Sequence, residues 1–219
     1  MTFSLLGRCA RTGMVGAAVT TSSIAVGSRC SHARAGVGAC LTQHRTDPRL
    51  GPLALDLLEK GYDADQVMRA LLAVAPHSGW RQLAVMDAAG RAAAFTGAFV
   101  AKEKAGEAHG TDCVAIANIV RSPEIPAVMV RAFEADPARS LADRLIGALQ
   151  AGEEAGGEFI PVVSAALVIA HREHFPYVDL RVDSHPAPIA DLARLWRDYQ
   201  PEADLYVIRA SDPAAAPPP

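Results

Sequence analysis

Aromatic side chains are scarce in this chain, at 5% of its residues, and charge of either sign is evenly spread. The 21 lysines and arginines are scattered among 24 aspartates and glutamates, so the formal net charge is only -3. A surface that binds nucleic acid needs a local basic stripe, and the sequence contains none. We therefore expect no nucleic-acid partner.

Long apolar runs are also missing. The longest, around residues 164–170, is far too short to cross a bilayer. The first residues have no basic segment ahead of an apolar one, and Arg8 and Arg11 interrupt them, so no secretory signal is predicted. These absences predict a soluble, cytoplasmic protein with no membrane partner.

Motifs that hold metals or cofactors are absent as well. Four cysteines occur, at Cys9, Cys30, Cys40 and Cys113. Without a C-x-x-C spacing they are predicted to be buried free thiols in a reducing compartment. His171 and His174 lie in a polar connection, which favours an exposed turn over a metal site. Glycine runs such as GVGACL lack the Lys-Ser or Lys-Thr of a phosphate loop, and no G-x-S-x-G elbow occurs. We expect no cofactor and no metal.

Small apolar residues dominate instead, and their runs predict a tightly layered fold. Strands are predicted at residues 2–7, 14–21, 37–42, 81–87, 91–97, 114–120, 162–170 and 177–182. Helices are predicted at residues 53–60, after Asp63 or Asp65, after Ser122-Pro123, after Ser140, and around residues 189–196. Paired helices between hairpins fit antiparallel sheets with helix layers outside, and fit a parallel βαβ sheet poorly.

The predicted fold class is therefore α+β. We expect a four-layer αββα sandwich of antiparallel sheets over residues 1–210. The Ala/Pro-rich residues 211–219 are predicted to form a disordered tail.

Thr2 is the first candidate for chemistry. It follows Met1, and a small second residue permits removal of that methionine. A free threonine then offers a hydroxyl beside its own α-amine, which titrates near ~7.7–8.0 and can act as a general base. The next strand ends in Thr20-Thr21-Ser22-Ser23. A nucleophile at the start of a buried strand, next to strand-end hydroxyls, is the layout of N-terminal-nucleophile enzymes.

A longer pattern runs from about Thr2 to Leu195. The stretches TFSLL, GMVGAAVTTSSIAVGS, ARAGVGACLTQ, GPLALDLLEKG, RQLAVMDAAGRAAAFTG and YVDLRVDSHPAPI resemble the domain-of-unknown-function 1028 family. The resemblance implies an N-terminal-nucleophile-hydrolase-like fold, and it names no settled substrate. The family often has an Arg-Gly-x-Gln segment before its late Ser-Ala-Ala-Leu strand. This chain has Glu158-Phe159-Ile160-Pro161 there, so a polar contact is expected to be missing.

Further site residues are predicted with structural alternatives beside them. Thr21, Ser22 and Ser23 are expected to contact substrate. Arg34 is either a clamp for a substrate carboxylate or part of a salt bridge. Asn118 donates to an oxyanion or satisfies loop backbone as a buried amide. Two strand-end residues are expected to hydrogen-bond a substrate amide or to cap the following turn, namely Thr42 and Gln43.

The leading functional hypothesis is a hydrolase of small amides or amidine-like compounds that forms an ester at Thr2. The alternative is a non-catalytic ligand-binding or scaffold protein of the same fold. The expected partners are a small-molecule substrate and further copies of the chain, in a homodimer or higher homo-oligomer.

Overall fold

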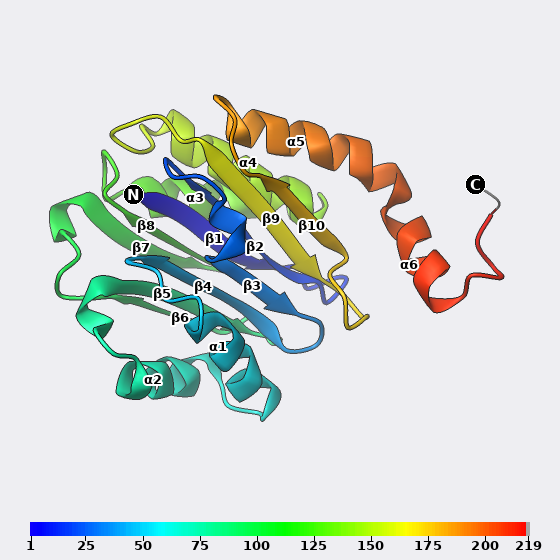
Figure 1. The fold of residues 1–219 in the computed structure, drawn as a ribbon, viewed down its shortest axis with the longest axis horizontal. Helices are drawn as coiled ribbons and strands as arrows, with labels where there is room; N and C mark the ends of the chain where they lie inside the picture. Colours follow the sequence, from blue (N-terminus) through cyan, green and yellow to red (C-terminus); the bar gives the residue numbers. More distant parts are fainter. Residues whose placement is uncertain (218–219) are drawn as a thin grey trace.

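The computed structural model describes residues 1–217 and contains two antiparallel sheets (Figure 1). The larger sheet has the order β10-β9-β2-β1-β8-β7. Its strands are β1 (Thr2–Arg8), β2 (Val15–Thr21), β7 (Ala105–Gly110), β8 (Cys113–Asn118), β9 (Ser164–Ala170) and β10 (Val178–Val182). The smaller sheet has the order β3-β4-β5-β6 and consists of β3 (Ser31–Arg34), β4 (Gly38–His44), β5 (Arg81–Asp87) and β6 (Ala92–Thr96).

Six α-helices accompany the sheets in the described residues. They are α1 (Leu50–Glu59), α2 (Ala64–Val74), α3 (Ile125–Glu134), α4 (Leu141–Glu154), α5 (Pro188–Tyr199) and α6 (Ala203–Ser211). The described residues also form single turns of 3₁₀ helix, namely η1 (Val26–Ser28), η2 (Ser78–Trp80), η3 (Lys102–Lys104) and η4 (Gln200–Glu202).

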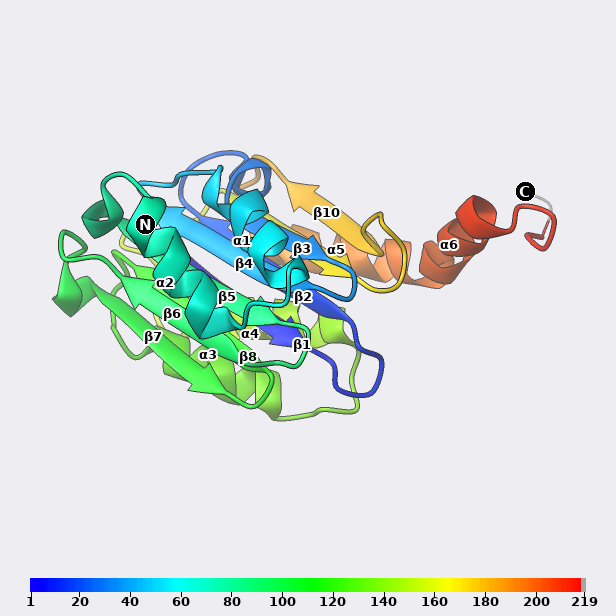
Figure 2. The same ribbon diagram turned by 90° about the horizontal axis from the view of Figure 1, so that it is seen from below.

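Three apolar clusters show how these elements stack. One, with Phe3 and Trp196, lies between the larger sheet and helices α3, α4 and α5. A second, with Leu6 and Met86, lies between the two sheets. The third, with Leu83, joins the smaller sheet to α1 and α2. The two helix groups therefore cover opposite outer faces of the paired sheets (Figure 2).

Local sequence signals explain where the helices begin and end. Asp63 accepts a hydrogen bond from the Gln66 backbone N–H, and the Gln66 side chain accepts one from the Asp63 N–H, which is a capping box. Ser140 accepts from the Asp143 N–H at 3.1 Å and begins α4. Gly61, just beyond α1, has a φ of 91°, a left-handed conformation that favours glycine.

Among the strands and α-helices of residues 1–217, three were not predicted. Strands β3 and β7 form one edge of each sheet, and their sequences SHAR and AGEAHG lack an apolar strand pattern. Edge strands gain most of their order from backbone pairing with one neighbour, which composition does not report. Helix α6 has only one buried residue, Ala203, so its sequence carries no strong apolar face.

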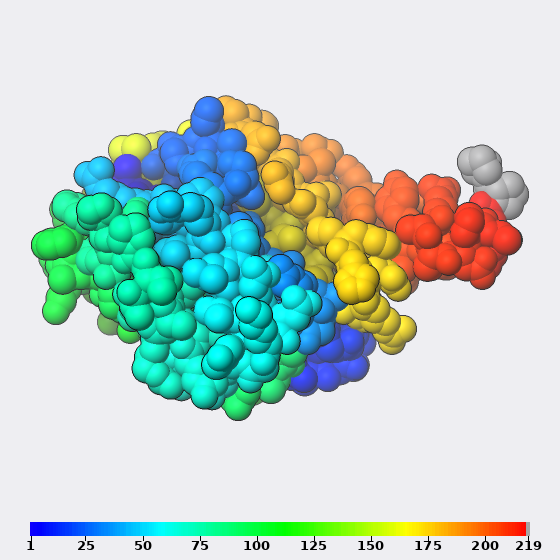
Figure 3. Space-filling model, turned by 60° about the horizontal axis from the view of Figure 1, so that its bottom comes forward, coloured from blue at the N-terminus to red at the C-terminus, as the bar shows by residue number. Residues whose placement is uncertain are grey.

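Helix α6 projects from the body of the molecule (Figure 3). It includes Ser211, so the predicted boundary between domain and tail falls inside its last turn. The chain then turns, with the Ala215 N–H donating to the Asp212 carbonyl, and Pro218 and Pro219 lie outside the described residues. The remaining prediction, a disordered tail, stays a prediction.

Burial and side-chain grouping add three observations on residues 1–217. The four cysteines are buried free thiols, as predicted. Nowhere in this range do three or more His, Cys, Asp or Glu side chains gather as a metal site would require. None of the helices in this range is both long enough and apolar enough to cross a membrane.

Candidate active site

The start of β1 lies beside the ends of two neighbouring strands. Strand β1 is antiparallel to both β2 and β8, so its first residue meets their last ones. Thr2 is directly opposite Asn118 on β8, and Phe3 is opposite Thr20 on β2. Residues far apart in the sequence therefore meet at the N-terminus, on an interior strand of the larger sheet, as predicted (Figure 1).

Strand alternation aims these side chains at the smaller sheet. Val19 and Ile116 belong to the apolar cluster between the sheets. Side chains two residues apart on a strand share a face, so Thr21 and Asn118 share that inner face. Thr2 is on the same face because it is opposite Asn118 in the register.

The Thr2 hydroxyl has two partners at this corner. Its Oγ1 donates to the Met1 carbonyl oxygen and lies 3.4 Å from the Thr21 hydroxyl. The Thr21 hydroxyl donates to the same carbonyl at 2.6 Å. Thr2 is only 6% exposed while Met1 precedes it. The two hydroxyls thus surround one carbonyl group.

A buried carboxyl, Glu158, lies next to these hydroxyls. It is 5% exposed, and its Oε2 accepts from the Ser22 backbone N–H at 3.0 Å, while Oε1 has no hydrogen-bond partner. Burial raises the pKa of the Glu158 carboxyl, and the Ser22 hydrogen bond and the amine at Met1 partly oppose that shift. Burial likewise lowers the pKa of the Met1 amine, with Glu158 acting against it. Carboxyl and amine therefore influence each other's charge.

Below the hydroxyls, a polar network connects the two sheets. Gln82 Oε1 accepts from Gln43 Nε2 at 2.7 Å and from Asn118 Nδ2 at 3.0 Å. The Ser4 hydroxyl donates to Gln43 Oε1 at 2.7 Å, and Gln82 Nε2 donates to the Ala117 carbonyl at 3.0 Å. Asn118 Nδ2 uses one of its two N–H groups on Gln82, and its Oδ1, an acceptor, is buried without a partner. Oδ1 is therefore available to accept an N–H, and since Nδ2 carries a second N–H, the oxyanion-donor role predicted for Asn118 stays a prediction.

A cavity of about 370 Å³ opens beside residue 1. It is lined by Met1, His44, Arg45, Trp80, Phe99, Ala101 and Ile119. Thr2 and Asn118 are opposite each other in the β1–β8 pairing, and Met1 and Ile119 are their neighbours in the chain. The cavity therefore lies next to Thr2 and Asn118.

Two residues that line this cavity have strained backbone. His44 has a φ of 65° and Ile119 a φ of 52°, both in the left-handed region. For a β-branched residue such as isoleucine this conformation is an outlier, and strain of this kind is about 1–3 kcal/mol per residue. Such positions cluster at binding and catalytic sites, which supports a functional reading of this corner.

The structure does not bring all the predicted residues here. Arg34 lies at the other end of the smaller sheet and pairs with Glu59 at 2.8 Å and Asp56 at 2.9 Å, so its salt-bridge alternative holds. Thr42 alternates to the helix side of β4 and donates to the Asp47 carbonyl. Ser23 is exposed and accepts from Arg29 at 2.7 Å. The residues that do meet are Thr2, Thr21, Ser22, Gln43 and Asn118.

Sequence reasoning missed two parts of the site. The segment GGEFIP was expected to lack a polar contact, but Glu158 provides one, because a β-bridge from Glu158 to Val120 draws the segment against the sheet. The signal available was an acid after the glycines that end α4. The aromatic lining of the cavity, Trp80 and Phe99, comes from connecting segments. The only signal in the sequence was that aromatic residues are scarce in this chain.

Two antiparallel sheets packed together, with helices on their outer faces and polar strand ends at one corner, define a mixed α/β protein. The chain belongs to the Family of unknown function (DUF1028), whose model matches residues 2–192, and the predicted resemblance is confirmed. It is similar to protein SPO2555 from Silicibacter pomeroyi, also of family DUF1028, with 30% identity, a TM-score of 0.84, and coverage of 91% of this chain and 86% of that chain.

A more distant match is Anbu (ancestral beta-subunit) from Yersinia bercovieri, with 10% identity and a TM-score of 0.43, covering 91% of this chain and 95% of that chain. No curated protein matches the chain.

Proposed function

We propose that this protein is an amidohydrolase of the N-terminal-nucleophile type, with the αββα order of layers, that uses Thr2 as nucleophile on a small amide or amidine-like compound. The observation that carries the proposal is the pair of hydroxyls, Thr2 and Thr21, around the Met1 carbonyl beside a cavity. Removal of Met1 frees the Thr2 amine and opens the cavity toward its hydroxyl.

In the proposed reaction, Thr2 Oγ1 forms a bond to the carbonyl carbon of the substrate, and its proton passes to the Thr2 α-amine. The C–N bond then breaks, and the nitrogen leaves with that proton. Water adds to the resulting ester, giving its proton to the same amine. The bond between the carbonyl carbon and Thr2 Oγ1 then breaks, the amine returns its proton to Oγ1, and the acid is released with the Thr2 hydroxyl restored. An amine near its ordinary pKa is suited to this exchange around neutral pH.

Thr21 is our candidate for the oxyanion donor. Its hydroxyl donates at 2.6 Å to the Met1 carbonyl, the group attached to the Thr2 nitrogen. A substrate carbonyl attached to Thr2 Oγ1 would lie close to the same place, because the nitrogen and the hydroxyl belong to one residue. Donors aimed at the developing oxyanion contribute about 2.7–4 kcal/mol in other hydrolases.

Two acceptors support the amine. Asn118 Oδ1 is fully buried without a partner and lies directly across the register from Thr2. Glu158 lies near enough to the chain's first amine to oppose the loss of its positive charge. In the proposal both groups orient N–H bonds of the Thr2 amine and neither attacks the substrate.

A specific observation favours the alternative of a non-catalytic ligand-binding protein. With Met1 present, Thr2 is buried and its hydroxyl is engaged, while the cavity beside it remains. A chain that keeps Met1 would bind a ligand there without reacting with it.

Intact-mass measurement followed by acylation separates the two functions. We expect purified protein to lack Met1 and to release p-nitroaniline from a panel of activated p-nitroanilides. Rapid acid quenching and peptide mapping should locate an acyl group on the Thr2 hydroxyl. Retained Met1, or an acyl group elsewhere, contradicts the proposal.

Substitutions of Thr2 test whether its hydroxyl is the nucleophile. Thr2→Ala and Thr2→Val should abolish turnover, because each removes the hydroxyl, and Thr2→Ser should keep part of it. Thr111→Ala, at an exposed turn, is the matched control and should react like the unsubstituted protein. Turnover that survives in Thr2→Ala would move the chemistry to another residue.

A further inference from the structure

We propose that the cavity beside residue 1 binds the part of a substrate that carries a flat apolar group and a carboxylate. Trp80 and Phe99 contact the flat group and Arg45 binds the carboxylate. The assignment of the ligand to a substrate rests on the proposed function, whereas its binding can be measured without any reaction.

The apolar part of the cavity is an aromatic pair. The rings of Trp80 and Phe99 have centroids 4.9 Å apart at 37°, and the two residues are 36% and 62% exposed. The His44 ring is stacked parallel to Trp80, with centroids 6.5 Å apart. Exposed aromatic faces that are held in place by their neighbours offer area for a flat ligand at little entropic cost.

The charge of the cavity comes from Arg45. Its Cζ lies 4.9 Å from the Trp80 ring centroid, within cation–π range, and no acid pairs with it among residues 1–217. The residues that line the cavity include no carboxylate within this range. A guanidinium that is held on an aromatic face presents its remaining N–H groups to a planar anion.

The groups around Arg45 keep this positive character. His44 Nδ1 lies 2.8 Å from the Trp80 carbonyl, which can only accept, so Nδ1 carries the hydrogen. Burial lowers the pKa of His44, so it is neutral near pH 7 and does not compete for an anion. The nearby Arg81 guanidinium lies 3.9 Å from Asp47, which Arg49 also contacts, and so is partly neutralised. Arg45 thus takes the role that the sequence analysis gave to Arg34.

The size of the cavity sets an upper limit on the ligand. Its 370 Å³ lies at the lower end of the range of about 300–1,000 Å³ found for small-molecule sites. One ring with a short acidic chain suits this volume, and a long peptide does not.

Binding is tested with N-benzoylglycine and its neutral amide, N-benzoylglycinamide, which differ only in the carboxylate. The Thr2→Ala protein, prepared with residue 2 as its first residue, is titrated with each compound by calorimetry, so that no turnover occurs. We expect the acid to bind at least about tenfold more tightly than the amide. Equal affinities, or no binding of the acid up to about 10 mM, would overturn the inference.

Three further variants identify the residues responsible. In Arg45→Gln the acid and the amide should bind with about equal affinity, and Arg45→Lys should keep part of the preference for the acid. Trp80→Ala should weaken both compounds. Arg69→Gln, at an exposed arginine of α2, is the matched control and should keep the full preference. A preference that survives Arg45→Gln contradicts the assignment of Arg45.

The two proposals fail separately. If N-benzoylglycine binds as expected but Thr2 forms no ester, the binding site stands and the hydrolase does not. If Thr2 forms esters with no preference for compounds that carry a carboxylate, the reaction stands and this inference is wrong.

Discussion

Glu158 is a carboxylic acid that the fold holds almost completely away from water. One of its oxygens accepts a single hydrogen bond, from the Ser22 backbone, and the other has no partner. Burial disfavours the charged form, so the carboxyl retains its proton to a higher pH when the protein is folded than when it is unfolded. Ionisable groups whose pKa is shifted by burial and by a specific charge partner cluster at functional sites.

This burial makes stability depend on pH in a defined direction. A pKa raised by folding means that the folded state binds more protons than the unfolded state. The contribution of Glu158 is therefore fully present below its ordinary pKa of 4.5 and is lost as the pH rises through the folded value. Glu158→Gln removes the titrating group. We expect the free energy of unfolding to shift in favour of the variant between about pH 4 and about pH 7.

Urea unfolding at several pH values measures this shift. Glu103→Gln, at an exposed position, is the control and should follow the unsubstituted protein. Parallel pH profiles for Glu158→Gln and the unsubstituted protein would show that Glu158 has no raised pKa.

At the scale of the elements, the two sheets are joined by amides as well as by apolar packing. Gln43, Gln82 and Asn118 are fully buried, and each comes from a different strand. Gln82 Oε1 is shared by the amides of the other two. The network sits between the candidate nucleophile and the apolar cluster, so it holds β8 at a set distance from β4 and β5.

Gln82→Leu tests how much this network contributes. The change keeps the volume but leaves the Gln43 and Asn118 amides without their acceptor, and an unsatisfied buried donor costs about 1–3 kcal/mol. We expect a loss of about 2–4 kcal/mol in the free energy of unfolding. Thr96→Val removes only one acceptor of Gln82 Nε2, which still donates to the Ala117 carbonyl at 3.0 Å, and should cost less than about 1 kcal/mol. Equal losses for the two variants would mean that the network contributes no more than its outermost contact.

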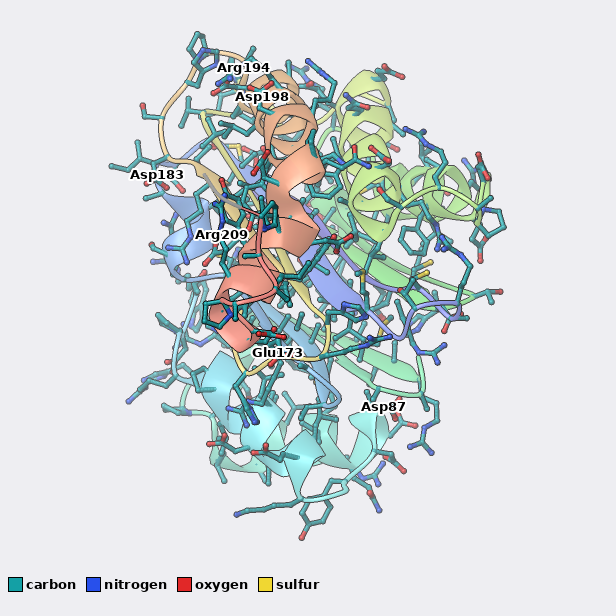
Figure 4. All side chains as sticks on the ribbon, turned by 90° about the vertical axis from the view of Figure 1, so that its right-hand side faces the viewer. Asp87, Glu173, Asp183, Arg194, Asp198 and Arg209 are labelled. Atoms are coloured by element: carbon teal, nitrogen blue, oxygen red, sulfur yellow. The ribbon has the colours of Figure 1, made fainter. Side chains whose placement is uncertain are left out.

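At the scale of the whole molecule, the C-terminal helices extend beyond the sheets. Figure 4 shows this end of the molecule. Arg194 and Asp198 lie on α5 and form an ion pair at 2.8 Å, and Glu173, in the connection between β9 and β10, lies near α6. Helix α6 is attached by few contacts. Among them are the hydrogen bond from Tyr177 to Asp204 at 3.0 Å and the packing of the Tyr206 ring against the Tyr199 ring, with centroids 5.4 Å apart at 35°.

Two truncations should therefore differ in effect. Removal of residues 212–219 costs α6 only the hydrogen bond from the Asp212 N–H to the Ile208 carbonyl and leaves its tyrosine contacts in place, and should change the free energy of unfolding by no more than about 0.5 kcal/mol. Removal of residues 203–219 eliminates the Tyr177–Asp204 bond and uncovers Tyr199, and should cost about 1–2 kcal/mol. Thermal unfolding of the two proteins measures the difference. A large loss from the shorter truncation would show that the segment packs on the domain or on a partner.

The sequence by itself determined the helices and strands whose formation depends on local physical chemistry. Apolar runs covered on both faces predicted β1 and β2, and the capping residues Asp63 and Ser140 predicted where two helices begin. Thr2 was found at the head of an interior strand for the same reason. Strands β3 and β7 were not predicted because an edge strand is specified by its neighbour and not by its own side chains.

Only the tertiary structure decided which side chains meet. The ion pairs of Arg34 with Asp56 and Glu59 depend on how α1 lies against β3, and no spacing in the sequence expresses that distance. Antiparallel pairing brought Asn118 to Thr2, and a single bridge brought in Glu158. Local propensity acts over a few residues, whereas the contacts of this site join residues from 19 to 136 positions apart, so packing alone selects its members.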